Sequence, residues 1–177
     1  MKVIVLSDGS IGAAVCIALA IHKYGKDNVS LITLSCDAKT HIKYRRSENL
    51  AKSYEIEYYI IEDTPYSKSL LLSSVANYIK LLREGKYIIY YGGTDSGDFI
   101  YNMNIALNIE YKGQIKVLAP LTGSSLEEII ELGNMFKIPF ELTWSCKRSD
   151  VKPCGQCIDC KEREKAFKRN GLIDPIK

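Results

Sequence analysis

The chain has 177 residues, of which 46% are hydrophobic and 25% are charged. These values are typical of one ordinary globular domain, and they exclude a disordered or fibrous protein. The formal net charge of +3 is too small to indicate a nucleic-acid partner, and we expect none. The sequence shows neither a signal peptide nor a run of about 18 apolar residues, so we expect a cytoplasmic protein without a membrane partner.

Apolar runs rich in β-branched residues predict buried strands, and they alternate with segments of helical periodicity. In chain order we predict a strand at 2–6, a helix from 11 that ends at 23–25, a strand at 29–34, a helix at about 41–54, a strand at 58–61, a helix at 69–83, a strand at 87–91, a helix at about 99–109, a strand at 115–119 and a helix that opens at 124–128. Strands and helices that alternate at these lengths predict an α/β fold with a doubly wound, mostly parallel sheet.

Four of the six cysteines crowd into one short segment near the end of the chain, Cys146, Cys154, Cys157 and Cys160. In a chain without an export signal, this clustering favours metal ligation over disulfides. Four thiolates can close a tetrahedron around zinc, and a Cys-x-x-Cys pair lets one turn present two sulfurs to the same ion. We therefore predict a structural zinc site, in which Gly155 allows the tight turn and no position is left open for catalysis.

Three other interpretations of the cysteines are open. An iron–sulfur cluster also uses closely spaced cysteines, but the ferredoxin pattern continues to a fourth cysteine followed by proline, which this sequence lacks. A redox or thiolation pair needs only one Cys-x-x-Cys motif, such as Cys157 with Cys160. The simplest case is a buried cysteine without a ligand, and this is how we interpret the isolated Cys16 and Cys36.

Three further side chains that could carry chemistry have simpler structural interpretations. Trp144, beside the cysteines, is predicted to fill the core rather than to stack on a ligand. His22 is predicted at the surface near the negative end of its helix dipole. His41 is predicted to cap a helix or to face solvent.

Several short motifs in the second half of the chain resemble one known enzyme family. They are Pro120-Leu121, Ile138-Pro139-Phe140, Thr143-Trp144-Ser145-Cys146, Cys154-Gly155-x-Cys157-x-x-Cys160, Arg163, Ala166-Phe167, Gly171 and Asp174-Pro175. Upstream, the segment 37–51 adds a further match, with His41 and Glu48-Asn49-Leu50-Ala51. The pattern resembles the 7-cyano-7-deazaguanine synthases, and the likeness spans most of the chain.

The resemblance implies an adenine nucleotide alpha hydrolase-like fold of the ATP-pyrophosphatase type, which we expect at residues 1–142, followed by a zinc-binding segment and helix at 143–177. It implies a cytoplasmic enzyme that uses ATP to convert 7-carboxy-7-deazaguanine and ammonia to the nitrile, for queuosine or archaeosine in tRNA or for deazaguanine modification of DNA. The implied ligands are a small 7-deazaguanine derivative, ATP and Mg²⁺. A homodimer is a further expectation, since symmetric dimers are common among small enzymes.

The nucleotide loop of that family, Ser-Gly-Gly-x-Asp-Ser, is altered in this chain to Ser7-Asp8-Gly9-Ser10-Ile11-Gly12. Backbone N–H groups in such a loop, together with a helix N-terminus, form a cradle for phosphate. We therefore assign to the nucleotide the residues Ser7, Asp8, Gly9, Ser10 and Gly12. The carboxylate of Asp8 would repel a phosphate unless a metal ion bridges the two groups.

The family's substrate segment after the fourth strand is replaced here by residues 92–98, Gly-Gly-Thr-Asp-Ser-Gly-Asp. This loop follows a predicted strand, at the edge of the sheet where doubly wound folds bind ligands. We assign to the substrate the residues Gly93, Thr94, Asp95 and Asp98, with a plain turn as the alternative. Both loops are altered, and Leu126 stands where the family has lysine. The rival interpretation is therefore a catalytically inactive or repurposed relative, held together by zinc, that acts as a binding or scaffold protein.

Overall fold

Parallel strands form the centre of the protein. The computed structural model describes residues 1–34, 41–62, 67–82, 85–94, 97–149 and 151–177. Within these ranges the strands are β1 (Lys2–Leu6), β2 (Val29–Leu34), β3 (Glu57–Ile61), β4 (Tyr87–Tyr91) and β5 (Ile115–Leu118). Their order is β3-β2-β1-β4-β5, and each neighbouring pair is parallel. The predicted parallel sheet is confirmed, and each predicted strand agrees with the observed one to within a residue at either end.

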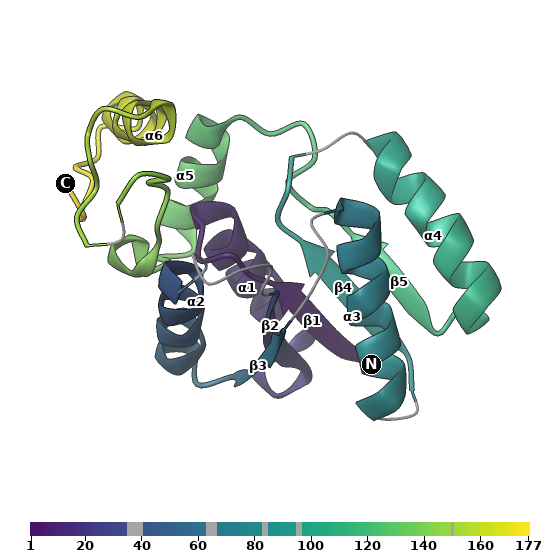
Figure 1. The fold of residues 1–177 in the computed structure, drawn as a ribbon. Coiled ribbons are helices and arrows are strands. Elements are labelled where there is room, and N and C mark those ends of the chain that lie inside the picture. The colour runs from purple at the N-terminus through teal and green to yellow at the C-terminus, as the bar shows by residue number, and fades with distance from the viewer. Residues whose placement is uncertain (35–40, 63–66, 83–84, 95–96, 150) are drawn as a thin grey trace.

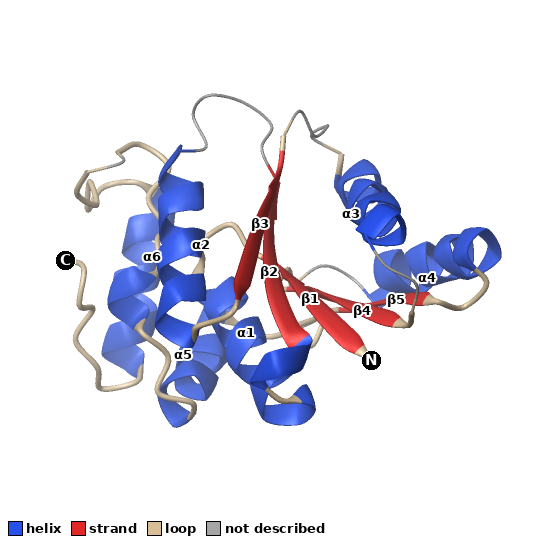
Figure 2. Ribbon diagram, turned by 90° about the horizontal axis from the view of Figure 1, so that it is seen from below, coloured by secondary structure: helices blue, strands red, loops and turns tan. Residues whose placement is uncertain are grey.

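Helices cover both faces of the sheet, as Figures 1 and 2 show. One face carries α1 (Ile11–Tyr24), α2 (His41–Tyr54), α5 (Leu126–Met135) and α6 (Ile158–Arg169). The opposite face carries α3 (Lys68–Leu82) and α4 (Gly97–Tyr111). Two short 3₁₀ turns, η1 (Lys26–Asn28) and η3 (Phe140–Leu142), complete the described elements. The doubly wound α/β arrangement predicted from the sequence is therefore present.

The side chains of β1 show how one strand supplies both hydrophobic cores. Val3 and Val5 are fully buried in the core beneath α1, while Ile4 between them belongs to the core beneath α3 and α4. Successive side chains of a strand point to opposite faces, so a strand covered on both faces must be apolar throughout. This requirement explains why β1 and β4 are nearly continuous apolar runs in the sequence.

The helix α5 begins at a capping box. The Ser125 hydroxyl accepts a hydrogen bond from the N–H of Glu128, and the Glu128 carboxylate accepts one from the N–H of Ser125. This reciprocal pair satisfies donors that the first turn of a helix leaves free. The cap fixes the start of α5, which packs against α1 and α6.

The order of the strands places the predicted ligand loops together. From β1 the chain winds outward to β2 and β3, and then returns to the other side of β1 to form β4 and β5. The strand order therefore reverses between β1 and β4, and such switch points form crevices at the carboxyl ends of the strands. The loop at residues 7–10 follows β1 and the loop at 92–94 follows β4, so both lie at this crevice.

None of the helices among the described residues is long and apolar enough to cross a bilayer.

Candidate functional site

A cavity of about 340 Å³ opens at the carboxyl ends of β1 and β4. Three of the predicted nucleotide-loop residues line it, namely Ser7, Asp8 and Ser10. Gly93, from the predicted substrate segment, lines the same cavity. Leu34 and Leu71 supply part of an apolar wall. The cavity thus combines a polar loop at a helix N-terminus with an apolar surface in one space, which suits a ligand with a flat ring and an anionic group.

Side chains of the loop satisfy several of its own backbone donors. The Ser10 hydroxyl accepts from the N–H of Ala13 at 3.3 Å and so caps α1. The carboxylate Oδ1 of Asp8 accepts from the N–H of Ser10 at 3.0 Å. The N–H of Gly9 donates to the Ser7 hydroxyl at 3.1 Å. With φ at 74°, Gly9 adopts a left-handed conformation that favours glycine, and this keeps the turn tight.

The loop is also held from outside, by residues that the sequence analysis did not assign to it. The Ser7 hydroxyl lies 2.8 Å from the hydroxyl of Ser47 on α2, in a buried pair. The carbonyl of Gly9 accepts a hydrogen bond of 2.7 Å from the backbone N–H of Trp144. Ser47 is fully buried, although it is a polar residue in a mostly polar helix, so its position in the chain gave no signal of this contact.

Gly12 lies against the backbone that follows β4. A Cβ atom at this position would lie 2.8 Å from the carbonyl oxygen of Gly92, which is shorter than real Cβ contacts. A Cβ atom on Gly92 would in turn lie 3.1 Å from the carbonyl carbon of Gly12. The two glycines therefore let the first turn of α1 approach the end of β4, and this contact fixes one side of the crevice.

The predicted substrate residues are placed at different depths. Gly93 lines the cavity, whereas Thr94 is exposed and Asp98 is exposed in the first turn of α4. The carbonyl of Asp98 accepts a hydrogen bond of 2.9 Å from the Asn102 side chain. Asp95 lies outside the described residues. The structure thus brings Gly93 next to the nucleotide loop and leaves Asp98 at the surface.

Lys68, at the start of α3, also lines the cavity and was not anticipated. A lysine just before an apolar helical segment is common on protein surfaces, and only the packing of α3 against the sheet turns it towards this crevice. As one of the residues that line the cavity, Lys68 brings a positive charge to its wall. When an anionic ligand enters the cavity, the positive charge of Lys68 would partly offset the repulsion between the ligand and the carboxylate of Asp8.

The four clustered cysteines form a second site. Their sulfur atoms all lie within 4.8 Å of one another, and the sulfurs of Cys154 and Cys160 are 4.0 Å apart. Cys157 is the residue just before α6, Cys160 lies in the first turn of that helix, and Gly155 takes a φ of 66° in the turn before them. This group could hold a metal ion. The predicted convergence of the four cysteines is confirmed.

Backbone N–H groups prepare three of these thiols for ionisation, and at Cys146 such hydrogen bonds outweigh the effect of burial and lower the pKa. Hydrogen bonds from the N–H groups of Gln156 and Cys157 lower the pKa of Cys154. The pKa of Cys157 is lowered as well, by backbone hydrogen bonds at residues 160 and 147. Burial instead raises the pKa of Cys160 to about 12. A divalent cation would remove that proton, because thiols bind metal ions as thiolates.

A buried arginine ties the cysteine segment to the end of the chain. Arg163 on α6 is 2% exposed, and its Nε lies 2.9 Å from the carboxylate of Asp174. Its guanidinium also donates to the Thr143 hydroxyl at 2.8 Å and to the carbonyl of Phe140 at 3.1 Å. Buried ion pairs require additional hydrogen bonds of this kind. Arg163 therefore fixes the segment that leads into Cys146.

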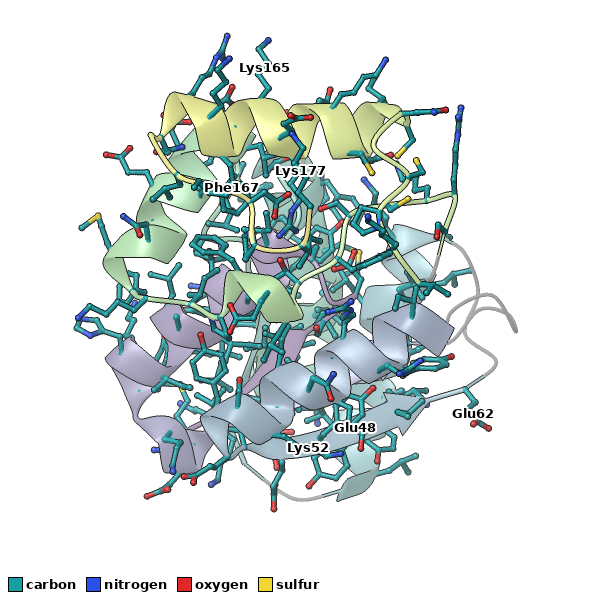
Figure 3. All side chains as sticks on the ribbon, turned by 90° about the vertical axis from the view of Figure 1, so that its left-hand side faces the viewer. Glu48, Lys52, Glu62, Lys165, Phe167 and Lys177 are labelled. Atoms are coloured by element: carbon teal, nitrogen blue, oxygen red, sulfur yellow. The ribbon has the colours of Figure 1, made fainter. Side chains whose placement is uncertain are left out.

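Aromatic packing attaches α6 to the rest of the domain. Phe167 is 1% exposed and points from α6 into the protein, while Lys165 points away from it (Figure 3). The ring of Phe167 meets that of Phe140 edge to face, with 5.0 Å between centroids. Such pairs add to the free energy gained by burial. The cysteine segment is thus joined to the α/β core through a helix with one buried face.

Solved structures with a similar fold include a synthetase and a tRNA thiolase. The structure of NMN synthetase from Francisella tularensis has a TM-score of 0.51 at 19% identity, over 97% of this chain and 78% of that one. The U34-tRNA thiolase NcsA from Methanococcus maripaludis, with its [4Fe-4S] cluster, has a TM-score of 0.51 at 15% identity, over 96% of this chain and 67% of that one. At these identities the likeness concerns the fold, which is adenine nucleotide alpha hydrolase-like as predicted.

Sequence comparison finds relatives among the 7-cyano-7-deazaguanine synthases. Residues 92–171 match the family described as "Queuosine biosynthesis protein QueC". The 7-cyano-7-deazaguanine synthase of Koribacter versatilis is 24% identical over 99% of this chain and 92% of its own length. The synthase of Campylobacter curvus is 32% identical over 64% of this chain, and the match spans 55% of that protein. The predicted relationship is therefore confirmed, and the chain is a relative of the 7-cyano-7-deazaguanine synthases.

Proposed function

We propose that the protein is an ATP-dependent enzyme that converts 7-carboxy-7-deazaguanine and ammonia to the nitrile 7-cyano-7-deazaguanine. The observation that carries this proposal is the shared cavity at the switch point, which the loop after β1 and the loop after β4 both line. One ATP activates the carboxylate, and ammonia displaces the activated oxygen together with its nucleotide-derived group to give an amide. A second ATP would activate the amide oxygen in the same way, and its departure with loss of two N–H protons gives the nitrile. Each half of this chemistry needs a nucleotide and a deazapurine side by side.

The walls of the cavity suit these two ligands. The loop formed by Ser7, Asp8, Gly9 and Ser10 leads into α1, and the first N–H groups of a helix have no partners within the helix. With Gly12 at that first turn, these groups and the positive end of the helix dipole would hold the phosphates. Lys68 would add a cation. The substrate ring would lie towards Gly93, while the assignments of Thr94, Asp95 and Asp98 to the substrate stay predictions.

The cysteine site is proposed to hold one structural zinc ion. Four sulfurs at about 2.3 Å from a tetrahedral ion lie roughly 3.8 Å apart, close to the 4.0 Å between Cys154 and Cys160. A four-iron cluster has to fit its iron and sulfide atoms between the cysteines, and sulfurs within 4.8 Å of one another leave too little space for it. With four protein ligands the ion has no open position, so its role is to fold the segment from Cys146 to Cys160.

One observation favours a second candidate, a relative that binds a purine without turnover. The Asp8 carboxylate already accepts from the N–H of Ser10, in the loop assigned to the phosphates. A loop whose donors are used internally has less to offer a triphosphate. A binding protein would keep the cavity and the zinc site and would show no ATP consumption.

The test is turnover by the purified, metal-loaded protein. Supplied with ATP, Mg²⁺, 7-carboxy-7-deazaguanine and ammonium, it should form the amide and nitrile, which mass spectrometry separates. ATP should be consumed only when the deazapurine and ammonium are both present. Tight binding of the deazapurine without any ATP consumption would reject the enzyme and support the binding protein.

A further inference from the structure

Asp8 is an exposed residue of the loop that is proposed to hold the phosphates. Its side chain lines the cavity of about 340 Å³, and its Oδ1 atom accepts a hydrogen bond of 3.0 Å from the backbone N–H of Ser10. Ser10 is the residue that caps α1, so its N–H belongs to the group of donors that would meet a phosphate. In this structure the carboxylate of Asp8 therefore occupies the N–H of Ser10, which a bound phosphate would otherwise use.

A carboxylate and a phosphate cannot share this donor without a penalty. Both are anions, and at a separation of about 4 Å two like charges repel measurably even at the dielectric of a protein surface. A triphosphate carries several such charges, which increases the repulsion. The loop as it stands disfavours free nucleotide, although its backbone conformation suits an anion.

A divalent cation reverses the sign of this interaction. Magnesium in nucleotide sites is held by one or two carboxylates together with substrate phosphates and water. A cation between Asp8 and the phosphates would attract both groups and would draw the carboxylate away from Ser10. The same side chain would then exclude free nucleotide and accept its metal complex.

We propose that Asp8 is a specificity-determining residue that makes the loop select the divalent metal complex of a nucleoside triphosphate over the free triphosphate. The proposal rests on the proposed function, because it concerns the same loop and the same ligand. In the absence of ligand, Asp8 holds the N–H of Ser10 and keeps the turn in its binding conformation. When the metal complex arrives, the carboxylate exchanges that donor for the cation.

Two variants separate the charge of Asp8 from its hydrogen bond. Asp8→Asn retains an Oδ1 acceptor for Ser10 and removes the charge, whereas Asp8→Gly removes both. Calorimetric titration with ATP, once in excess Mg²⁺ and once in EDTA, gives the ratio of the two affinities for each protein. The zinc site should be loaded beforehand and its content checked after the EDTA titration.

For the unaltered protein, we expect magnesium to tighten ATP binding by a large factor. In both variants free ATP should bind roughly tenfold or more tightly than it does to the unaltered protein, because the repulsion is gone. The magnesium-dependent gain should shrink correspondingly in both variants. Faster hydrogen exchange at the Ser10 amide is expected in Asp8→Gly but not in Asp8→Asn, which shows that only the former lost the hydrogen bond.

The outcomes distinguish this proposal from the function on which it rests. If all three proteins bind the magnesium complex but show the same ratio of affinities with and without magnesium, Asp8 does not select the ligand and the proposal is wrong, while the nucleotide site stands. If Asp8→Gly binds ATP without magnesium and the unaltered protein binds it only with magnesium, the role of Asp8 and the nucleotide site are both supported. Absence of ATP binding in all three proteins under both conditions overturns the two together.

Discussion

The backbone N–H of Trp144 donates a hydrogen bond of 2.7 Å to the carbonyl of Gly9, and this bond joins the cysteine segment to the nucleotide loop. The indole is 6% exposed and donates from Nε1 to the carbonyl of Cys146 at 2.9 Å. The guanidinium of Arg46 lies 4.7 Å above its ring. One residue therefore contacts the metal-binding segment on one side and the proposed phosphate site on the other, and the two sites should influence each other.

Removal of the metal is expected to loosen the nucleotide loop. Without a cation, the cysteines lose the interaction that holds them together, and Trp144 should move with Cys146. Because the chain has one tryptophan, its fluorescence reports this change directly. We expect a red-shifted emission and faster hydrogen exchange at Gly9 and Ser10 when a chelator extracts the ion.

The same coupling must act in reverse, since binding free energies at linked sites are reciprocal. Saturating magnesium and ATP should slow metal loss and raise metal affinity by roughly fivefold or more. A Cys16→Ala variant serves as the control, because it removes a thiol that is buried in the core beneath α1 and lies outside the cysteine cluster. Its metal affinity should respond to ATP as that of the unaltered protein does. Complete metal loss with unchanged fluorescence and unchanged exchange at Gly9 would show that the two sites are independent.

Truncation of Arg163 should be strongly destabilising. In Arg163→Met the carboxylate of Asp174, whose side chain is 9% exposed, loses its buried partner. Breaking a buried pair in this way costs about 3–5 kcal/mol of unfolding free energy. Arg169→Met is the matched control on the same helix, because its pair with Glu127 is exposed and its loss should change stability little. Urea unfolding followed by circular dichroism gives the unfolding free energy of both variants. Equal losses of unfolding free energy would refute the conclusion that Arg163 fixes the cysteine segment.

A side chain at Gly12 should separate the two ligand loops. In Gly12→Ala the new methyl group meets the carbonyl oxygen of Gly92 at 2.8 Å, so backbone must shift. Overpacking of this kind costs about 1–3 kcal/mol, and the displaced loop should bind ATP less tightly. Gly97→Ala, where a Cβ atom meets nothing within 4 Å, should leave stability and ATP affinity nearly unchanged. If the two alanine variants behave alike in thermal unfolding, the close approach is not a constraint.

Loss of the Lys68 charge should weaken nucleotide binding. Lys68 lines the cavity, while Lys80, on the same helix, donates to Gln114 at its far end. We expect Lys68→Ala to reduce ATP affinity roughly tenfold, as one charge-assisted contact would. Lys80→Ala should have the affinity of the unaltered protein. Equal affinities in the two variants would place the phosphates away from α3.

Local patterns predicted the fold well, because they depend on neighbours in the sequence. Strands that are covered on both faces must be continuously apolar, and this signal located β1 and β4 to the residue. Closely spaced cysteines likewise predicted their own convergence. Trp144 and Cys16 are buried, as predicted, and His22 is exposed near the end of α1.

Contacts between distant segments could not be predicted in this way. The pair of Ser7 with Ser47 joins residues whose local sequences give no hint of each other, and the same holds for Trp144 and Gly9. Lys68 reaches the cavity only because α3 packs on the sheet. Cys36 and Asp95 lie outside the described residues, as does the side chain of His41, so their predicted roles stay predictions.

The most direct test of the account is calorimetric titration of the metal-loaded protein with ATP in the presence of magnesium, together with zinc analysis of the same sample. The account predicts one zinc ion and one bound nucleotide per chain, with binding weakened by Gly12→Ala and Lys68→Ala. A folded protein that contains zinc and releases no heat of binding with ATP would contradict it, because the loop of β1 would then hold no triphosphate.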